Sequence, residues 1–136
     1  QTLIPSLLKQ GRSTLDYEIE VLMSKDSRFI TGVDRDLILK RCQDYKGVRI
    51  LISHGTFTIP ETARYLGEKN LEKTIVLFGS MVPANRNDSD APFNLGTAIA
   101  AVHILPFGVY VAMNGRVFTW TNVVKNTEKG IFEYRK

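Results

Sequence analysis

Apolar and polar residues are arranged along the chain in a pattern that predicts strands and helices in turn. Short runs of consecutive apolar residues, typical of parallel strands buried on both faces, occur at 48–53, 74–78 and 109–113. Helical patterns at 60–69 and 89–105 separate these runs. The order strand, helix, strand, helix, strand predicts one doubly wound α/β domain with right-handed crossovers and a mostly parallel sheet.

The remaining segments predict a few smaller elements. Residues 4–10 have a short helical pattern, and residues 17–23 alternate apolar with polar side chains, as a half-buried strand does. Thr31 followed by Asp34 resembles a capping box, which would open a further helix. The Asn-Gly pair at 114–115 predicts a tight turn into one more strand.

Composition and charge limit the class of protein. The chain has 136 residues, of which 43% are apolar and 10% aromatic, enough to fill the core of one domain and too many for a disordered tail. The formal net charge is +4, and the basic residues are scattered among acidic ones. A nucleic-acid groove normally concentrates its basic residues in one stripe, so we expect no nucleic-acid partner.

Cysteine content and hydropathy favour a cytoplasmic location. Cys42 has no second cysteine to pair with, as is usual in a reducing compartment, and its helical pattern predicts a buried thiol. The first residues lack the charged start and apolar stretch of a signal peptide. The most apolar window, 98–113, is interrupted by Pro106 and Gly108 and is too short to span a bilayer. We therefore expect a cytoplasmic protein with no membrane partner.

Polar residues follow the predicted parallel strands at their carboxyl ends, where sheets of this kind bind ligands. They lie at 53–58, 79–81 and 114–115, and the loop 25–28 joins them if the strand before it ends at the same edge. These residues predict a site for a small polar or anionic ligand. A nucleotide- or flavin-binding module would have the same topology, but the sequence has no phosphate-binding glycine loop. Two histidines without clustered thiols or carboxylates predict no metal, and no cofactor is expected.

Several motifs resemble those of one known family. Residues 52–58 (ISHGTFT) are similar to the HGTDT signature of bacterial-type L-asparaginases, and residues 77–81 (LFGSM) to the TGAM strand end of that family. The resemblance continues in the same order through three more segments, at 89–95, 108–115 and 124–127. Because these matches cover most of the chain, the sequence resembles the compact, single-domain asparaginase-like proteins.

This resemblance implies a fold and a class of partner. The fold would be a flavodoxin-like or Rossmann-like three-layer sandwich, as in the N-terminal domain of the family. Residues 1–136 are then expected to form a single domain of this type, without the family's first TGGTI strand and without its C-terminal domain. The resemblance also implies a small amino-acid amide as substrate, and a homo-oligomer, either a dimer or a tetramer.

The resemblance further assigns roles to single residues. The family's primary nucleophile is a threonine on the TGGTI strand, a segment that this sequence does not contain. A second centre, Thr-Asp-Lys, activates the attacking hydroxyl or water. Thr56 matches its threonine and Lys125 its lysine, so these two are the candidate catalytic residues. The residues implied in substrate binding are Asp26, Ser27, Gly55, Phe57 and Ser80.

Phe57 stands where the family has the aspartate of this second centre. A carboxylate there would pair with Lys125 and with the ammonium group of a substrate, whereas a phenyl ring offers only a weaker cation–π contact. Beside a ring, Lys125 is expected to lose its proton more easily. Two functions stay open: an asparaginase-like amidohydrolase with impaired activity, and an inactive domain that binds a small polar ligand or a protein partner.

Overall fold

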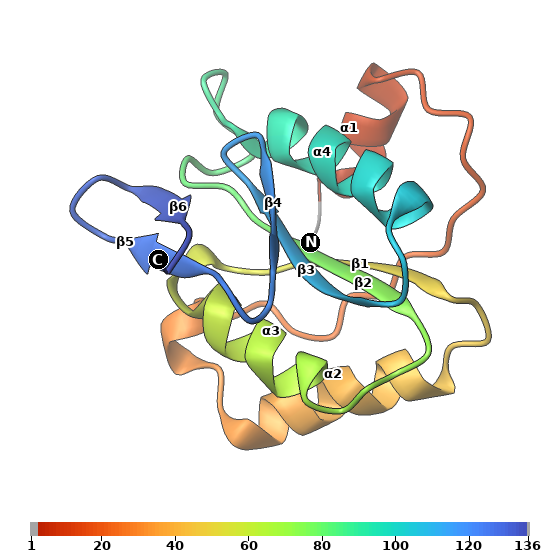
Figure 1. Ribbon diagram of the computed structural model, residues 1–136. Helices are drawn as coiled ribbons and strands as arrows, with labels where there is room; N and C mark the ends of the chain where they lie inside the picture. Colours follow the sequence, from red (N-terminus) through yellow and green to blue (C-terminus); the bar gives the residue numbers. More distant parts are fainter. Residues whose placement is uncertain (1–2, 136) are drawn as a thin grey trace.

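A four-stranded sheet forms the middle layer of the computed structural model, which describes residues 3–135. Its strands lie in the order β1, β2, β3, β4 (Figure 1). The first three run parallel, which confirms the predicted direction, and β4 returns antiparallel to β3. The bounds are β1 Arg49–Ser53, β2 Thr74–Phe78, β3 Gly108–Met113 and β4 Arg116–Thr119.

Helices cover both faces of this sheet, so the three-layer architecture is as predicted. In Figure 1, α1 and α4 lie on one side of the sheet and α2 and α3 on the other. The residues of β2 alternate between the two faces and all are buried. Both faces of the sheet therefore need an apolar helical layer. The bounds are α1 Ile4–Gln10, α2 Gly32–Asp44, α3 Ile59–Gly67 and α4 Ala91–Ile104.

The two crossovers between the parallel strands have opposite hands. The steps from β1 to β2 and from β2 to β3 move in the same direction across the sheet. However, α3 makes the first connection on one face, and α4 makes the second on the other. Two crossovers that move in the same direction across a sheet, but pass over opposite faces of it, must have opposite handedness. The prediction that both crossovers are right-handed is thus wrong for one of them.

The strand predicted at 17–23 is absent. From residue 13 to residue 26 the chain is extended but pairs with no described strand. Alternation favours an extended backbone, but a strand also needs a neighbour for its backbone hydrogen bonds, and the sheet ends at β1. For the same reason β1 is only half-buried, whereas burial on both faces was predicted. The apolar side chains of this segment that are exposed include Tyr17, Ile19 and Val21.

Local signals at helix and turn ends are confirmed. Thr31 and Asp34 form the reciprocal capping box at the start of α2, and Cys42 is buried on that helix. Asn114 and Gly115 both have positive φ, 58° and 72°, as the tight turn between β3 and β4 requires. The predicted helix at 89–105 begins two residues later, at Ala91, because the residues before it build a loop described below.

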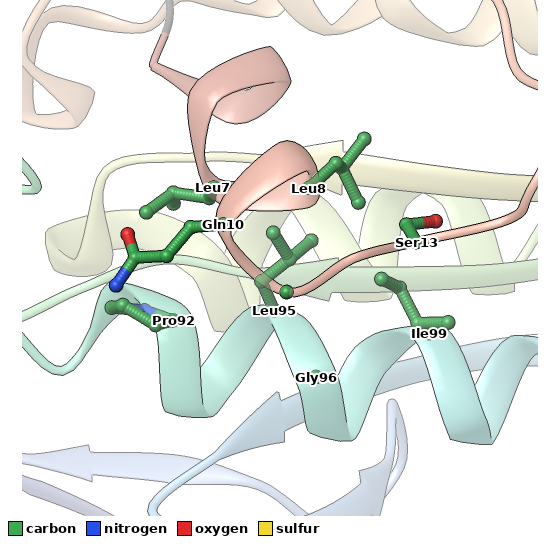
Figure 2. A pocket seen from close by; sticks show the side chains of 9 residues that line it. Leu7, Leu8, Gln10, Ser13, Pro92, Leu95, Gly96 and Ile99 are labelled. Carbon is green, nitrogen blue, oxygen red and sulfur yellow. The ribbon is translucent and has the colours of Figure 1, made fainter.

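A hollow of about 310 Å³ lies between α1 and α4 (Figure 2). Its walls are mostly hydrocarbon, from Leu7 and Leu8 on one helix and Leu95 and Ile99 on the other. It contains none of the predicted site residues, so it is separate from the candidate site. In the part of the chain that the structure describes, no helix is both long and apolar enough to cross a membrane.

Candidate functional site

Thr56 and Lys125, 69 residues apart in sequence, meet beyond the carboxyl end of β1. Thr56 opens a short 3-10 helix, η2 (Thr56–Thr58), and Lys125 lies in the middle of β5 (Val124–Asn126). The Lys125 Nζ donates a hydrogen bond to the Thr56 Oγ1 at 3.0 Å. The structure thus brings the two candidate catalytic side chains into direct contact.

A small β-hairpin positions Lys125 next to Thr56. β5 pairs antiparallel with β6 (Ile131–Glu133) in a two-stranded sheet of its own. Phe132 of β6 is only 2% exposed, and its backbone N–H donates to the Asn114 Oδ1 at 2.7 Å. The hairpin is therefore attached to the turn that follows β3 and to the core below it.

Phe57 presents a half-exposed ring next to this contact. The ring is 50% exposed and has two cations near it. The Lys125 Nζ lies 4.4 Å from its centroid, and the Arg28 guanidinium carbon 5.1 Å. The ring provides a weak cation–π attraction for both groups.

Ser27 is buried against the same loop. It begins a second 3-10 helix, η1 (Ser27–Phe29), and is 1% exposed. Its Oγ accepts a hydrogen bond from the Thr58 N–H at 3.2 Å, and its carbonyl accepts one from the Thr58 hydroxyl at 2.9 Å. Gly55 is packed so tightly here that a Cβ would lie 2.9 Å from the Ser27 side chain. Ser27 thus holds the loop in place through its oxygen atoms, and its hydroxyl keeps a proton that it can donate.

Asp26 is also occupied by a neighbour. Its carboxylate accepts two hydrogen bonds from the Arg28 guanidinium, at 2.7 and 3.1 Å, and one from the Arg28 N–H. The Arg28 side chain holds the pKa of this carboxyl below its usual value. Asp26 is therefore a charged, paired group that positions Arg28 beside Phe57.

Ser80 follows β2, next to a glycine that touches Thr56. A Cβ on Gly79 would lie 2.3 Å from the His54 carbonyl and 3.2 Å from the Thr56 Cγ2, so only glycine fits there. Ser80 is half-buried beside it. The loops after β1 and β2 therefore lie against each other, as the parallel sheet predicts.

Two residues that the sequence analysis left without a role hold this second loop. The Asp90 carboxylate accepts hydrogen bonds from the backbone N–H groups of Met81 and Val82, both at 3.0 Å. The Asn94 Nδ2 donates to the Gly79 carbonyl at 2.9 Å and to Asp90 at 3.0 Å. Burial alone would raise the pKa of Asp90, but these donors outweigh it and the pKa is lowered. In the sequence, only the family-like motif at 89–95 contains Asp90 and Asn94, and it indicated no role for either residue.

His54 belongs to a structural network below the site. Its Nδ1 lies 2.7 Å from the Gly55 carbonyl, so Nδ1 carries the proton and Nε2 accepts from the Thr62 hydroxyl at 2.9 Å. The same Thr62 oxygen accepts a hydrogen bond from the Arg35 Nε at 2.9 Å. Burial lowers the pKa of His54, which keeps the ring neutral. The histidine therefore fixes the loop after β1 and does not face a ligand.

The electrostatics of the site centre on Lys125. Burial lowers the pKa of its ammonium group. Among the described residues, no carboxylate lies within 4.0 Å of its Nζ, so nothing counteracts this shift by direct pairing. The site can therefore supply a neutral amine next to a hydroxyl, which is suited to proton transfer. No group of three described His, Cys, Asp or Glu side chains is placed to hold a metal ion.

Comparisons with known proteins agree over most of the chain. The family model "Asparaginase, N-terminal" matches residues 3–132. The glutaminase-asparaginase of Acinetobacter glutaminasificans is 39% identical over 119 residues, which are 85% of this chain and 35% of that protein. An L-asparaginase of Thermococcus kodakarensis is 34% identical over 96 residues, covering 69% of this chain and 29% of the relative. The chain thus spans about a third of the length of these curated relatives.

A solved structure supports the same relationship. The crystal structure of the probable cytoplasmic L-asparaginase from Campylobacter jejuni superposes with a TM-score of 0.82 at 29% identity. The superposition covers 96% of this chain and 46% of that one. The mixed α/β fold with its mostly parallel sheet is therefore shared with a solved L-asparaginase.

Proposed function

Because the chain belongs to the asparaginase family, we propose that it is an asparaginase-like amidohydrolase domain that acts on the side-chain amide of L-asparagine or a similar small amide. The observation that carries this proposal is the 3.0 Å contact between the Lys125 Nζ and the Thr56 Oγ1. In the neutral state the amine accepts a proton from the Thr56 hydroxyl, which in turn deprotonates the attacking hydroxyl or water.

The reaction balances as a hydrolysis. The attacking oxygen forms a bond to the amide carbon, the carbon–nitrogen bond breaks, and ammonia leaves with the proton that Lys125 returns. The products are a carboxylic acid and ammonia. Gly55, Phe57 and Ser80 would line the space for the rest of the substrate, with Ser27 and Asp26 supporting it from behind.

Phe57 is proposed to impair this reaction. It offers no carboxylate to orient the Lys125 ammonium or to receive an ammonium group of the substrate. Members of a catalytic unit act together, so a missing member typically costs orders of magnitude in rate. We propose very slow asparagine hydrolysis by the chain as it stands.

The second candidate function is ligand binding without turnover. Two observations favour it: Ser27 and Asp26 are already engaged by Thr58 and Arg28, and the Phe57 ring already has two cations near it. Such a domain would bind a small polar ligand or a protein partner. It would release no ammonia whatever the pH.

The deciding experiment measures ammonia released from L-asparagine by the wild type, Phe57→Asp and Phe107→Asp. The last makes the same change at an exposed phenylalanine away from the site and should match the wild type. We expect Phe57→Asp to release ammonia about 100-fold faster than the wild type or more, which is the usual range for a proton-transfer group. This gain is expected at least in proteins to which a TGGTI segment has been added at the N-terminus. A wild type with ordinary turnover that Phe57→Asp does not improve would refute the impairment. No release by any variant favours the binding domain.

We also propose a cellular location and an assembly state. A cytoplasmic location agrees with the single, buried Cys42 and with the relative from Campylobacter jejuni, a probable cytoplasmic L-asparaginase. A dimer or tetramer is proposed from the family. Light scattering coupled to size-exclusion chromatography gives the mass that decides it.

A further inference from the structure

The surroundings of Phe57 differ in charge from a site built for an ammonium group. Two cationic side chains, Arg28 and Lys125, lie within about 5 Å of the ring centroid. Asp26, the carboxylate that pairs with Arg28, already accepts three hydrogen bonds from it. Within residues 3–135, this leaves Lys125 as a cation with no carboxylate paired to it.

The remaining polar groups of the site do not place a carboxylate next to Lys125. The Ser27 hydroxyl is buried and bonded to the Thr58 N–H. The Asp90 carboxylate is held by the backbone of the loop after β2 and by Asn94. A ligand whose amide carbon lies next to Thr56 would therefore meet the Lys125 amine, which contacts Thr56, and the Phe57 ring, which has Lys125 and Arg28 near it.

The excess of positive charge around Phe57 matters because the charged groups of a small amide lie close to its reacting carbon. In a four-carbon amide such as asparagine, the α-substituents lie three bonds from the amide carbon, within about 4 Å. At pH values where Lys125 is protonated, an α-ammonium would thus lie beside this unpaired cation, and the two like charges would repel. A cation–π contact could not compensate, because Arg28 and Lys125 already surround the ring. A carboxylate at the far end of the ligand would instead be attracted by the unpaired Lys125 and, more weakly, by Arg28, whose charge Asp26 already pairs.

We propose that Phe57 and Arg28 select amides that carry a carboxylate and lack an α-ammonium, the class of succinamic acid, over L-asparagine. This inference rests on the proposed function, since it assumes that the amide binds next to Thr56. Hydrolysis of such a substrate gives succinate and ammonia, and hydrolysis of asparagine gives aspartate and ammonia. Succinate and L-aspartate therefore form a matched pair of product ligands that differ only in the ammonium group.

The test titrates the 136-residue chain with succinate and with L-aspartate and follows the NMR signals of the Phe57 ring and the Lys125 side chain. Binding of a product needs no turnover, so the result is independent of activity. We expect succinate to bind at least about tenfold more tightly, as one uncompensated charge at this distance near a surface allows. Equal affinity, tighter binding of L-aspartate, or no saturable binding of either ligand overturns the proposal.

Matched variants identify the residues responsible. Phe57→Asp adds a carboxylate and should reverse the preference, whereas Phe57→Leu removes the ring without adding charge and should keep it. Arg28→Gln frees the Asp26 carboxylate and should narrow the preference for succinate. Arg86→Gln, which removes an exposed arginine paired with Asp88, should change neither affinity. A Phe57→Asp protein that still prefers succinate would contradict the role assigned to Phe57.

The hydrolysis assay separates this inference from the proposed function. Ammonia release from succinamic acid at a rate at least tenfold above that from asparagine supports both. A clear preference for succinate in binding, without release from either amide, supports the selection of ligands and contradicts the amidohydrolase. Faster release from asparagine than from succinamic acid contradicts the selection alone.

Discussion

Lys125 is a residue whose ammonium group gives up its proton more easily than a free lysine does. Burial lowers its pKa from the usual 10.5, and its one described hydrogen bond goes to the neutral Thr56 hydroxyl. An aspartate at position 57 would oppose this shift, because a neighbouring negative charge favours the protonated amine. Replacing the aspartate by phenylalanine thus weakens the binding of cations and makes the neutral amine more available.

Proton transfer by Lys125 should therefore depend on pH. If the neutral amine accepts a proton from Thr56, ammonia release rises with pH through the lowered pKa, with its midpoint below 10.5. The folded state also favours the neutral form, so the free energy of unfolding increases with pH over the same window. NMR titration of the Lys125 side chain gives the pKa directly. A Lys125→Arg protein, which stays protonated, should lose the alkaline rise, and an unchanged profile would contradict the base role.

Thr62 joins His54 and Arg35 through one hydroxyl. Thr62→Val keeps the shape of the side chain but leaves the His54 Nε2 and the Arg35 Nε without this partner. We expect a loss of about 1–3 kcal/mol in the free energy of unfolding, the usual cost of an unsatisfied buried polar group. Denaturant unfolding measures it. Thr97→Val, which removes an exposed hydroxyl bonded to the Phe93 carbonyl, should change stability by less than about 0.5 kcal/mol.

Among the elements, the loop between β2 and α4 is organised by a carboxylate. Asp90 accepts two backbone N–H groups, and an asparagine there has a single acceptor oxygen. Asp90→Asn should therefore cost about 1–3 kcal/mol at neutral pH, more than Asp88→Asn at an exposed position.

The acid side of the stability curve provides a second measurement for Asp90. The pKa of its carboxyl is lowered in the folded state, so its contribution is present above the unfolded value and is lost as the pH falls through the folded one. Asp90→Asn should reduce the fall in stability below pH 3.8. An equal fall in both proteins would contradict the assigned role of the carboxylate.

Elements with strong local signals could be predicted from the sequence, and those that depend on a partner could not. Three parallel strands, the capping box at Thr31 and the turn at Asn114 follow from apolar runs and local chemistry. The segment 17–23 has the alternation of a strand but no described strand to pair with. The same limit applies to the site. Motifs placed Thr56 and Lys125, whereas the positions of Arg28 beside the ring and of Asp90 under the loop depend on tertiary packing.

At the scale of the molecule, one edge of the sheet is open. Only β2 pairs with β1 among the described strands, and β1 is half-buried. Exposed backbone groups on such an edge favour pairing with another chain. The segment 13–26, which pairs with no described strand, also exposes Ile19 and Val21.

This open edge predicts that the 136-residue chain associates as its concentration rises. Replacing Ile19 and Val21 by serine should reduce the mass measured by light scattering at high concentration, because the apolar part of the contact is lost. Replacing Val33 and Ile104, which are more exposed and lie on α2 and α4, should reduce it less. Equal effects of the two pairs would indicate association through another surface.

The β5–β6 hairpin makes the site dependent on a local equilibrium. A sheet of two strands is marginally stable by itself, and this one is held mainly by the buried Phe132 and its bond to Asn114. Opening of the hairpin would carry Lys125 away from Thr56 while the four-stranded sheet stays folded. Amide hydrogens of Val124–Asn126 should then exchange with deuterium faster than those of β2, and Phe132→Leu should widen the difference. The local stability of β5, a strand of three residues, would then determine the fraction of molecules in which Lys125 contacts Thr56. The stability of the whole domain would not determine it.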